Sequence, residues 1–358
     1  MTGTSLAAVL TAPRKIEMQQ FPLPEIGPDD GLLKIEATGV CGSDIPLYLN
    51  MDVPMILGHE CVGTIAALGE RASKRWGVKE GDRIVIEEPY PCGRCHACRT
   101  VNYQLCEASG RYGKTPLSVQ PSLWGGYSQY MYLHPNSLVY KIADHVPVEI
   151  APMFIPVSNG IRWVQQVGRA GIGDTVVVQG PGQHGLGCVI AAKEAGAGKI
   201  IVIGLERDRT RLELAKELGA DHVVAADLDD PVEQVNVLTG GALADLVLDV
   251  TAGSPMAINT ALDLVKIGGT IVLAGAKNRP VDNFMSDNIF RKELTLRGVS
   301  GRDFRAVTPA LRLIESGKYP LAKLSTHHFS LQDTELALKV FKGEIQTGVD
   351  PIHVTITP

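Results

Sequence analysis

Four of the seven cysteines stand close together in a spacing that could hold a metal ion. Cys92, Cys95, Cys98 and Cys106 follow the pattern C-x2-C-x2-C-x7-C. Four thiolates on one short segment can close a tetrahedral zinc site with no open position, which is the arrangement of a structural zinc. Two disulfides are the alternative, but a reducing compartment favours a metal. His96, inside the segment, is expected to face solvent rather than to act as a ligand.

A second group of candidate ligands lies earlier in the chain. Cys41 is followed by Ser43 and Asp44, and His59 is followed by Glu60. Zinc accepts thiolate and imidazole, and a neighbouring carboxylate fixes the imidazole tautomer. A buried cysteine can equally be a small apolar residue, and a lone histidine is often a hydrogen-bonded core residue. Each segment taken alone therefore leaves a structural role open.

The segment 176–187 has the pattern of a strand, a glycine-rich turn and a helix. In a dinucleotide-binding turn, Gly180 would allow the sharp bend, Gly182 the approach of backbone N–H groups to a pyrophosphate, and Gly185 close packing of helix and strand. Glycine-rich turns also occur where nothing binds. The turn predicts a dinucleotide site only together with the residues that follow it.

Glu206 supplies that context, because it ends the next predicted strand roughly 20 residues after the last glycine. A carboxylate there can accept hydrogen bonds from both ribose hydroxyls and repels a 2′-phosphate, which predicts NAD rather than NADP. Arg207 and Arg211 could partly offset this repulsion. The alternative is an ordinary acidic residue on the surface.

Length and composition narrow the class of protein. A chain of 358 residues with 45% hydrophobic residues predicts two domains. A net charge of -5 without a Lys/Arg cluster excludes the electrostatic footprint of a nucleic-acid binder and favours small-molecule partners. The sequence shows neither a signal peptide nor an apolar run long enough to span a membrane, so we expect a cytoplasmic protein without membrane partners.

The elements that must position these residues change character along the chain. Short alternating runs near 5–11, 15–20 and 32–38, separated by Pro- and Gly-rich turns, predict a compact β domain without helical periodicity. Beyond Pro147 the pattern becomes helical, and strands then alternate with helices. Such alternation predicts an α/β fold with a doubly wound parallel sheet and its ligand at the carboxyl ends of the strands. The predicted strands are 175–179, 199–204, 222–225, 246–250, 270–274 and 294–299, and the helices between them 185–195, 207–218, 231–239, 256–265 and 286–291.

The chain resembles the zinc-containing medium-chain dehydrogenase/reductases, which include alcohol, sorbitol and threonine dehydrogenases. The resemblance rests on the Gly-His-Glu segment with Gly63 and Gly69, on the Cys-Gly-Ser-Asp segment, on the four clustered cysteines (the cysteine lobe) and on the glycine-rich turn at 180–185 (the glycine turn). The resemblance runs nearly end to end. It implies a GroES-like, β-rich catalytic domain over 1–151 with a structural-zinc lobe at 88–110, a Rossmann domain over 152–301, and a return to the first domain over 302–358. It also implies a homodimer or homotetramer.

The same resemblance assigns roles to individual residues. Cys41 and His59 would bind a catalytic zinc, Ser43 would pass on the proton of the substrate hydroxyl, and Asp44 and Glu60 would lie in or beside the metal's outer shell. The residues expected at the cofactor are Asn159, Gly180, Gly182, Gln183, His184, Gly185, Glu206, Arg211 and Gly275.

Three positions depart from the family pattern. The third catalytic-zinc ligand falls on Ile155, which cannot bind a cation, and a histidine that relays the proton in many members is Pro46 here. His184 replaces an aliphatic residue, as a polar wall or as a tolerated exchange. We expect Glu60 to move into the first shell and complete the ligand set with Cys41 and His59. Water or a substrate oxygen in the third place, or an empty site, are the alternatives.

Taken together, the residues and the resemblance predict an NAD-dependent, zinc-assisted dehydrogenase that oxidises an alcohol or polyol to a carbonyl compound. Two alternatives remain at this point. One is a zinc-free quinone or enone reductase of the same superfamily, against which Cys41, His59 and Glu60 argue. The other is a catalytically decayed NAD-binding protein, which only Ile155 favours.

Overall fold

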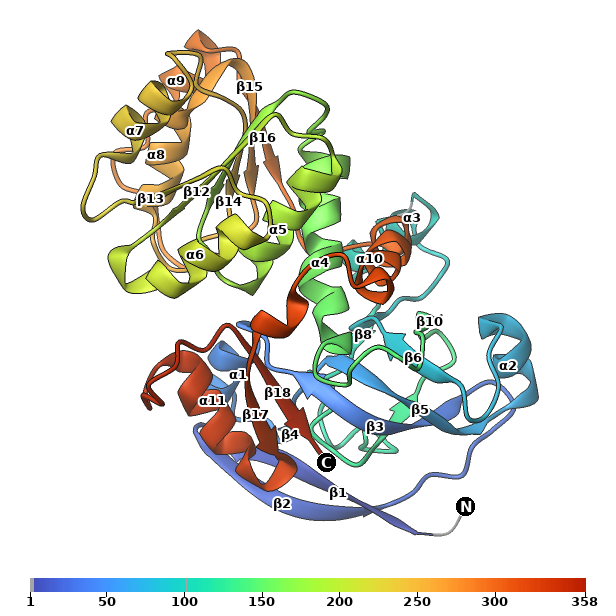
Figure 1. Ribbon diagram of the computed structural model, residues 1–358. Coiled ribbons are helices and arrows are strands. Elements are labelled where there is room, and N and C mark those ends of the chain that lie inside the picture. Colours follow the sequence, from blue (N-terminus) through green and yellow to red (C-terminus); the bar gives the residue numbers. More distant parts are fainter. Residues whose placement is uncertain (1–2, 101) are drawn as a thin grey trace. The chain divides into compact units, whose positions relative to one another are not determined.

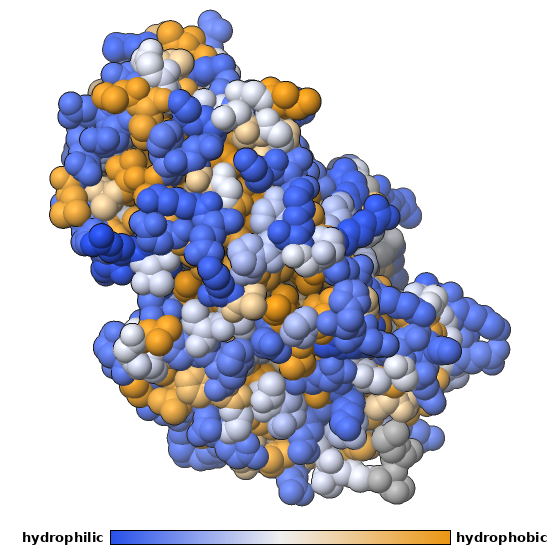
Figure 2. Space-filling view, viewed as in Figure 1, coloured by the Kyte–Doolittle hydropathy of each residue, from blue (hydrophilic) through white to orange (hydrophobic). Residues whose placement is uncertain are grey.

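The computed structural model describes residues 3–100 and 102–358, and its chain divides into two units (Figure 1). The first contains Met1–Phe154, Ile314–Gly317 and Leu321–Pro358, and the second contains Ile155–Leu313 and Lys318–Pro320. No helix in the described part is long and apolar enough to cross a membrane. Hydrophilic residues cover most of the face seen in Figure 2, and apolar ones occur there in small groups.

The first unit is built mainly from β-sheet. Its strands are β1 (Thr4–Ala12), β2 (Lys15–Pro22), β3 (Gly31–Gly39), β4 (Met55–Ile56), β5 (Glu60–Leu68), β6 (Arg83–Ile86), β7 (Pro89–Tyr90), β8 (Gly110–Arg111), β9 (Tyr130–Leu133), β10 (Val139–Lys141), β17 (Ser325–Ser330) and β18 (His353–Thr357). The largest sheet has the order β10-β6-β5-β3-β18-β17, with β9 paired to β3. Smaller sheets are β2-β1-β4 and β7-β8. A segment from the end of the chain, β18, thus lies directly beside β3 from its beginning.

Two apolar clusters stabilise this unit. One cluster contains Val9 of β1, Ile56 of β4 and Val354 of β18. The other contains Leu33 of β3, Ile84 of β6 and Trp124. All six side chains are at most 4% exposed. Burial on this scale is the main force that holds the sheets together, at about 25 cal/mol per Å² of apolar surface.

The β domain also contains helices that the sequence pattern did not predict. These are α1 (Asp44–Asn50), α2 (Glu70–Trp76), α3 (His96–Arg99), the 3-10 turn η1 (Tyr103–Leu105) and, near the C-terminus, α11 (Thr334–Lys342) with the turns η5 (Leu321–Lys323) and η6 (Leu331–Asp333). The stretch 5–38, for which no helical periodicity was found, contains strands and no helix. The helices elsewhere in this unit have at most nine residues, and such short helices show a 3.6-residue period only weakly.

The second unit contains a six-stranded parallel sheet in the order β13-β12-β11-β14-β15-β16. This is the strand order of a Rossmann fold, whose ligand binds where the order reverses, here between β11 and β14. The strands are β11 (Thr175–Gln179), β12 (Lys199–Gly204), β13 (His222–Ala225), β14 (Ala244–Asp249), β15 (Val265–Leu273) and β16 (Thr295–Gly298). The predicted α/β class with a doubly wound sheet is confirmed.

Helices cover both faces of this sheet (Figure 1). Along the chain from residue 151 to 316, the helices and helical turns are η2 (Ala151–Met153), α4 (Phe154–Ile161), continued by the π-helix η3 (Arg162–Val167), α5 (Gln183–Glu194), η4 (Glu206–Asp208), α6 (Arg209–Glu217), α7 (Pro231–Leu238), α8 (Met256–Leu264), α9 (Asp287–Arg291) and α10 (Phe304–Ser316). Of these, α5, α6, α7 and α8 contact the strands of the sheet. The central strands are buried on both faces. Val176 to Val178 and Ile200 to Val202 are all 0% exposed, which explains their unbroken apolar runs.

Candidate active site and metal centres

Three candidate metal ligands meet at one end of a strand pair in the first unit. Gly39, the last residue of β3, pairs with Glu60, the first residue of β5, so Cys41 and His59 flank the same end of the pair. One ligand atom from each of Cys41, His59 and Glu60 lies within 4.8 Å of the other two. The three residues are 8%, 3% and 0% exposed. Antiparallel pairing therefore gathers a thiol, an imidazole and a carboxylate, which are the donor types that zinc takes.

Asp44 orients two of these residues from a fully buried position. Its Oδ2 accepts hydrogen bonds from the backbone N–H of Cys41 at 3.0 Å and from the hydroxyl of Tyr127 at 2.9 Å. Its Oδ1 lies 3.3 Å from Nδ1 of His59. A proton held on Nδ1 by this carboxylate leaves the lone pair of Nε2 for a metal, which is the usual support of a zinc-bound histidine.

The charges around this site are mostly negative. Burial raises the pKa of the Cys41 thiol, and the carboxylate charge of Glu60 raises it further. Burial alone would lower the pKa of His59, but the negative charges of Asp44 and Glu88 raise it well above its usual value. Both shifts have one cause, an excess of acidic groups in a place with little water, and a divalent cation would balance such an excess.

Ser43 lies at the open side of the group. Its Oγ is 3.4 Å from Sγ of Cys41 and 3.5 Å from Nε2 of His59, and the residue is exposed to solvent. A hydroxyl there can receive a proton from a bound molecule and pass it to water. Pro46 is exposed on α1 and has no side-chain group that could relay a proton.

Ile155 supplies no ligand atom. It lies on α4 in the second unit and is 1% exposed. The three donor atoms described above all belong to the first unit and already equal the number of protein ligands that catalytic zinc usually has.

The four clustered cysteines converge as their spacing suggested. Sγ of Cys98 lies 3.9 Å from Sγ of Cys92 and 3.5 Å from Sγ of Cys95, and all four sulfur atoms, with that of Cys106, lie within 4.8 Å of one another. A disulfide would need about 2.05 Å. A tetrahedral site with bonds of about 2.3 Å has sulfur-to-sulfur edges of about 3.8 Å. The distances therefore fit a shared metal ion, and His96 is exposed and outside the donor group.

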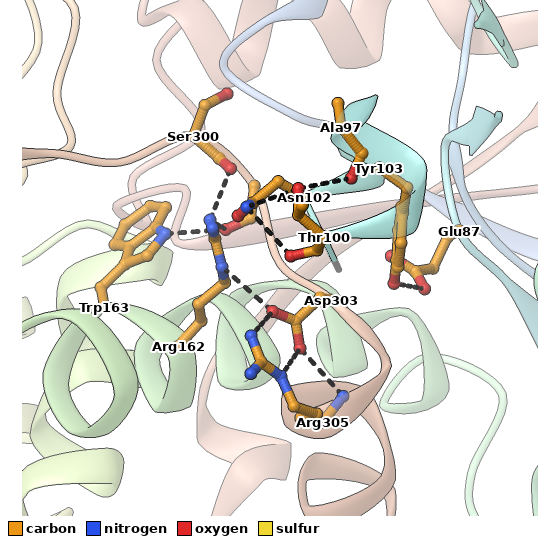
Figure 3. Close-up of polar contacts among 11 residues, drawn as sticks. Glu87, Ala97, Thr100, Asn102, Tyr103, Arg162, Trp163, Ser300, Asp303 and Arg305 are labelled. Atoms are coloured by element: carbon orange, nitrogen blue, oxygen red, sulfur yellow. Dashed lines mark hydrogen bonds and ion pairs between the residues drawn. The ribbon is translucent and has the colours of Figure 1, made fainter. Parts of the chain in front are cut away.

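Local backbone groups prepare this lobe for a cation. Hydrogen bonds from the backbone N–H groups of Arg94 and Cys95 lower the pKa of Cys92 to about 6, whereas burial raises the pKa of Cys98 to about 12. The lobe is anchored by Tyr103, whose hydroxyl donates to Oε1 of the buried Glu87 at 2.7 Å (Figure 3). These contacts hold the sulfur atoms in place without help from a large apolar core.

In the second unit, the glycine turn has the geometry that a dinucleotide requires. Gly180 has a φ of 101°, which favours glycine. A Cβ on Gly185 would lie 1.9 Å from the carbonyl oxygen of Gly180, so no larger residue fits where α5 passes the turn. A Cβ on Gly182 would meet no atom within 4 Å, which leaves the backbone open to a ligand at the start of α5.

Polar groups without partners surround the start of α5. Gln183 is 6% exposed, and neither its amide oxygen nor its amide nitrogen has a hydrogen-bond partner among the described residues. Asn159 on α4 is 5% exposed, its Oδ1 is likewise unpartnered there, and its Nδ2 lies 3.4 Å from Nδ1 of His184. The ring centroid of Trp163 is 5.4 Å from that of His184. Buried amides without partners are costly, so this arrangement indicates that a polar ligand completes them.

Glu206 lies just after β12, as the sequence suggested, but its neighbours differ from expectation. Its Oε1 is 3.3 Å from Nη1 of Arg209, and its backbone N–H donates to Oδ1 of Asp227 at 2.8 Å. Arg211 instead lies 3.9 Å from Asp208. Arg209, which the sequence pattern did not single out, therefore lies beside Glu206, and Asp227 places a second acidic residue at this edge.

A buried cluster that was not predicted from the sequence lies at the carboxyl ends of β14 and β15. Nζ of Lys277 lies 2.9 Å from Oδ1 of Asp249 and donates to Oγ1 of Thr251 at 2.7 Å. Lys277 is 9% and Asp249 0% exposed. Thr251 in turn packs against Gly180, and its carbonyl oxygen would lie 2.0 Å from a Cβ on Gly275. The cluster thus fixes the loops beside the glycine turn, and only a terminal Asp on a strand hinted at it.

A second buried ion pair fixes the segment after β16. Nη1 of Arg162 donates to the carbonyl oxygen of Ser300 at 2.8 Å, and its Nε lies 3.5 Å from Oδ2 of Asp303 (Figure 3). Trp163 donates to the carbonyl oxygen of Gly301 at 2.9 Å. Every group of this network is paired within the protein, which indicates a structural role rather than ligand binding.

Comparisons with known proteins agree over most of the chain. Residues 27–144 match the family model "Alcohol dehydrogenase GroES-like domain", and residues 185–316 match "Zinc-binding dehydrogenase". The chain is 43% identical to the "Probable alcohol dehydrogenase adh" of Mycobacterium tuberculosis over 361 residues, which cover 98% of both chains. It is 33% identical to the sorbitol dehydrogenase of Bacillus subtilis over 94% of both chains. An alcohol dehydrogenase structure from Thermotoga maritima matches with a TM-score of 0.89 and 26% identity, over 99% of this chain and 100% of that one.

Proposed function

Because the chain belongs to the zinc-binding dehydrogenases of the alcohol dehydrogenase family, we propose that it catalyses the reversible, NAD-dependent oxidation of a small alcohol or polyol to the carbonyl compound, with zinc bound at both cysteine-containing sites. The observation that carries this proposal is the buried group of Cys41, His59 and Glu60, whose ligand atoms lie within 4.8 Å of one another. The family relationship supports action on an alcohol. The dependence on zinc and on NAD is proposed from the residues of the two sites.

The donor set suits a divalent cation. A thiolate on Cys41 and a carboxylate on Glu60 balance two positive charges, and the Nδ1 contact with Asp44 turns the lone pair of His59 toward the site. A zinc ion held there would supply the Lewis acid that polarises the substrate oxygen and lowers the pKa of its hydroxyl. We propose Glu60 as the third ligand because its carboxylate lies beside Cys41 and His59, whereas Ile155 has no donor atom.

Residues of the chain would then accept the proton of the substrate and keep the imidazole of His59 in place. The hydroxyl proton of the alcohol passes to Oγ of Ser43, which lies beside both Cys41 and His59 and is open to water. The carbon gives up its hydrogen with two electrons, and the oxygen and carbon form the carbonyl group. Asp44 keeps His59 in one tautomer throughout, so the imidazole neither takes up this proton nor turns away.

The second unit provides the cofactor site. The nicotinamide of NAD supplies the acceptor for the two electrons and hydrogen. The turn at Gly180 and Gly182 and the first N–H groups of α5 would bind the pyrophosphate, and Glu206 would bind the ribose hydroxyls. The amide of Gln183, the Oδ1 of Asn159 and the ring of His184 would form hydrogen bonds with the cofactor. Gly275 and Arg211 would lie at the edge of the proposed cofactor site.

The four-cysteine lobe is proposed to bind a second, structural zinc. Its four sulfur atoms occupy every position of a tetrahedral site and leave none for a substrate. This zinc would stabilise the lobe rather than take part in the reaction.

Zinc counting and a dehydrogenase assay on the same freshly purified protein test the proposal. We expect one zinc for each of the two ligand groups, and formation of reduced nicotinamide, followed by its absorbance, with at least one alcohol of a panel of primary, secondary and polyhydric alcohols. Full activity with zinc only in the cysteine lobe would instead support a zinc-free reductase. Tight NAD binding without turnover on any alcohol or carbonyl compound would support a protein that has lost catalysis.

A further inference from the structure

The carboxylate of Glu60 stands between two buried groups, the candidate metal ligands and the imidazole of His353. Nε2 of His353 lies 3.9 Å from Oε2 of Glu60, and both side chains are 0% exposed. This distance is longer than a hydrogen bond, but a small rotation of either side chain would bring the two polar groups into hydrogen-bond contact. Because both side chains are buried, their contact is not a chance contact of flexible groups at the surface.

Strand register brings the two groups together. Gly39 on β3 pairs with Glu60 on one side and with Thr355 on β18 on the other side. The same register joins the N–H of Val40 to the carbonyl oxygen of Val354, and one further step sets His353 level with Cys41. Side chains two residues apart on a strand share a face, so His353 and Thr355 point to the same side of the sheet.

Gly39 leaves the space that this pair occupies. A Cβ on Gly39 would lie 2.5 Å from Oε2 of Glu60 and 3.0 Å from Nε2 of His353. Any other residue would therefore push the carboxylate or the imidazole out of place. The space is shaped for a carboxylate that points from β5 across the end of β3 toward β18.

From this geometry we infer that His353 is a positioning residue for the metal ligand Glu60. By holding one oxygen of the carboxylate, the imidazole leaves the other oxygen directed at the position that Cys41 and His59 share. A flexible carboxylate binds zinc well only when its orientation is fixed, and groups that orient ligands typically change metal affinity by about 10–100-fold. Because Ile155 offers no donor, this chain depends on that orientation more than a site with a second thiolate would.

This inference rests on the proposed function, because it needs a zinc ion at Cys41, His59 and Glu60. It also requires that His353 act through Glu60 and not merely fill the core. The side chains of glutamine and asparagine separate the two roles. The amide nitrogen of glutamine can take the place of Nε2, whereas the shorter asparagine cannot reach it, yet both are polar and smaller than or similar to histidine.

The test compares zinc release from wild type, His353→Gln, His353→Asn and His353→Leu. Each holoprotein is mixed with a chromophoric chelator, and the zinc of the cysteine lobe serves as an internal reference. We expect His353→Asn and His353→Leu to release the zinc of the Glu60 site about 10–100-fold faster than wild type, and His353→Gln to stay close to wild type. His327→Leu is the matched control, because His327 is also largely buried in the same sheet and is hydrogen-bonded to Thr347 at 2.7 Å instead.

Cobalt substitution gives a second readout that simple loss of packing would not move. The visible spectrum of Co²⁺ at the Glu60 site should shift in His353→Asn and not in His327→Leu, because only the former changes the ligand geometry. Unchanged zinc release and an unchanged cobalt spectrum in both His353→Asn and His353→Gln would overturn the role of His353 alone. A wild type that binds zinc only in the cysteine lobe would overturn the proposed function, before any variant is compared.

Discussion

At the scale of single residues, the candidate active site is defined by a balance of charge. Cys41, Asp44 and Glu60 bring three acidic groups to a site with one imidazole, and none of these side chains is more than 8% exposed. Such a group is stable in a low-dielectric place only if a cation joins it or some acids stay protonated. The same balance makes single substitutions informative.

Replacing Glu60 by alanine should remove the zinc that Cys41 and His59 share, because two protein ligands hold zinc weakly. We expect the metal content to fall by one ion per chain and kcat/KM for the best alcohol to fall at least about 100-fold. Mass spectrometry of the native protein and the reduced-nicotinamide assay measure the two effects. Glu60→Gln is the control for shape. A tightly bound second zinc in Glu60→Ala would show that Glu60 is not a ligand.

Cofactor choice is also decided by a single side chain. Glu206 should repel the 2′-phosphate of NADP and accept hydrogen bonds from the ribose of NAD, so wild type should bind NAD more tightly. Glu206→Gln should reduce this preference about 10-fold, since one charge interaction of roughly 1.4 kcal/mol is lost. Titration of the quenching of the protein's tryptophan fluorescence by each nucleotide measures both affinities. Glu213→Gln on the exposed side of α6 is the control, and tighter binding of NADP by wild type would contradict the role of Glu206.

At the scale of elements, short segments with little apolar core depend on hydrogen bonds, ion pairs and, as we propose for the cysteine lobe, a metal ion. The cysteine lobe consists of α3, η1 and the loops around them, and one of its anchors is the contact of Tyr103 with the buried Glu87. Helix α2 is likewise short, and Ala72 is its buried residue. Ion pairs of Arg71 and Arg75 with Asp29 hold α2, and we propose that zinc has the corresponding role in the cysteine lobe.

The lobe should therefore lose its structure when one sulfur is lost. Cys95→Ser should release one zinc per chain and lower the melting temperature by several degrees or reduce soluble yield, because structural zinc contributes folding energy. Calorimetry and metal analysis follow these changes. Cys188→Ser, which alters a buried thiol on α5 far along the sequence, is the control. Retention of full zinc content and stability by Cys95→Ser would argue against a zinc at this lobe.

Helix α2 should show a dependence on pH that reports its ion pairs. Hydrogen bonds from Arg71, and then from Arg75, lower the pKa of Asp29 from 3.8 to about 2. A carboxyl with a lowered pKa stabilises the fold above its ordinary pKa, and this contribution is lost as the pH falls from about 4 to about 2. Because the Asp29 side chain is 33% exposed, salt weakens the effect.

Asp29→Asn should accordingly be less stable than wild type at pH 7, and the difference should shrink below pH 4. Urea unfolding at a series of pH values, at low and at high salt, measures it. Asp52→Asn, a change at an exposed acid outside α2, should show no such trend. A difference between Asp29→Asn and wild type that stayed constant from pH 7 to pH 3 would mean that the ion pairs do not stabilise α2.

At the scale of the whole molecule, metal ligands and the nucleotide turn belong to different units. Both ligand groups lie in the unit that contains Met1–Phe154, and the glycine turn lies in the unit that contains Ile155–Leu313. Each unit has its own apolar core. Removal of metal should therefore act first on one unit.

Hydrogen exchange measured by mass spectrometry can test this separation. After zinc is removed with a chelator, peptides that contain 39–62 and 88–110 should exchange faster, because local opening is no longer opposed by metal bonds. Peptides of β11 and β12 in the parallel sheet should exchange as before. Equal acceleration in β11 and β12 would show that the metal sites stabilise both units together.

Features that depend on a local pattern of residues could be predicted from the chain alone. Unbroken apolar runs and the glycine turn predicted the parallel sheet, and the strands 175–179, 199–204 and 222–225 begin and end where the structure has them. The C-x2-C-x2-C-x7-C spacing brought four sulfur atoms together because all four ligands lie on one short segment. The domain boundaries and the roles of the site residues remain predictions for experiment.

Contacts between residues far apart in the chain became known only from the folded structure. His353 comes beside Glu60, and β18 beside β3, through a strand order that no local periodicity encodes. Lys277 meets Asp249 and Thr251 for the same reason, across loops of different strands. A sequence pattern has the period of one element, whereas these contacts depend on how several elements pair. For that reason, the candidate ligands and the nearby Asp44 could be named from the chain, whereas His353 could not.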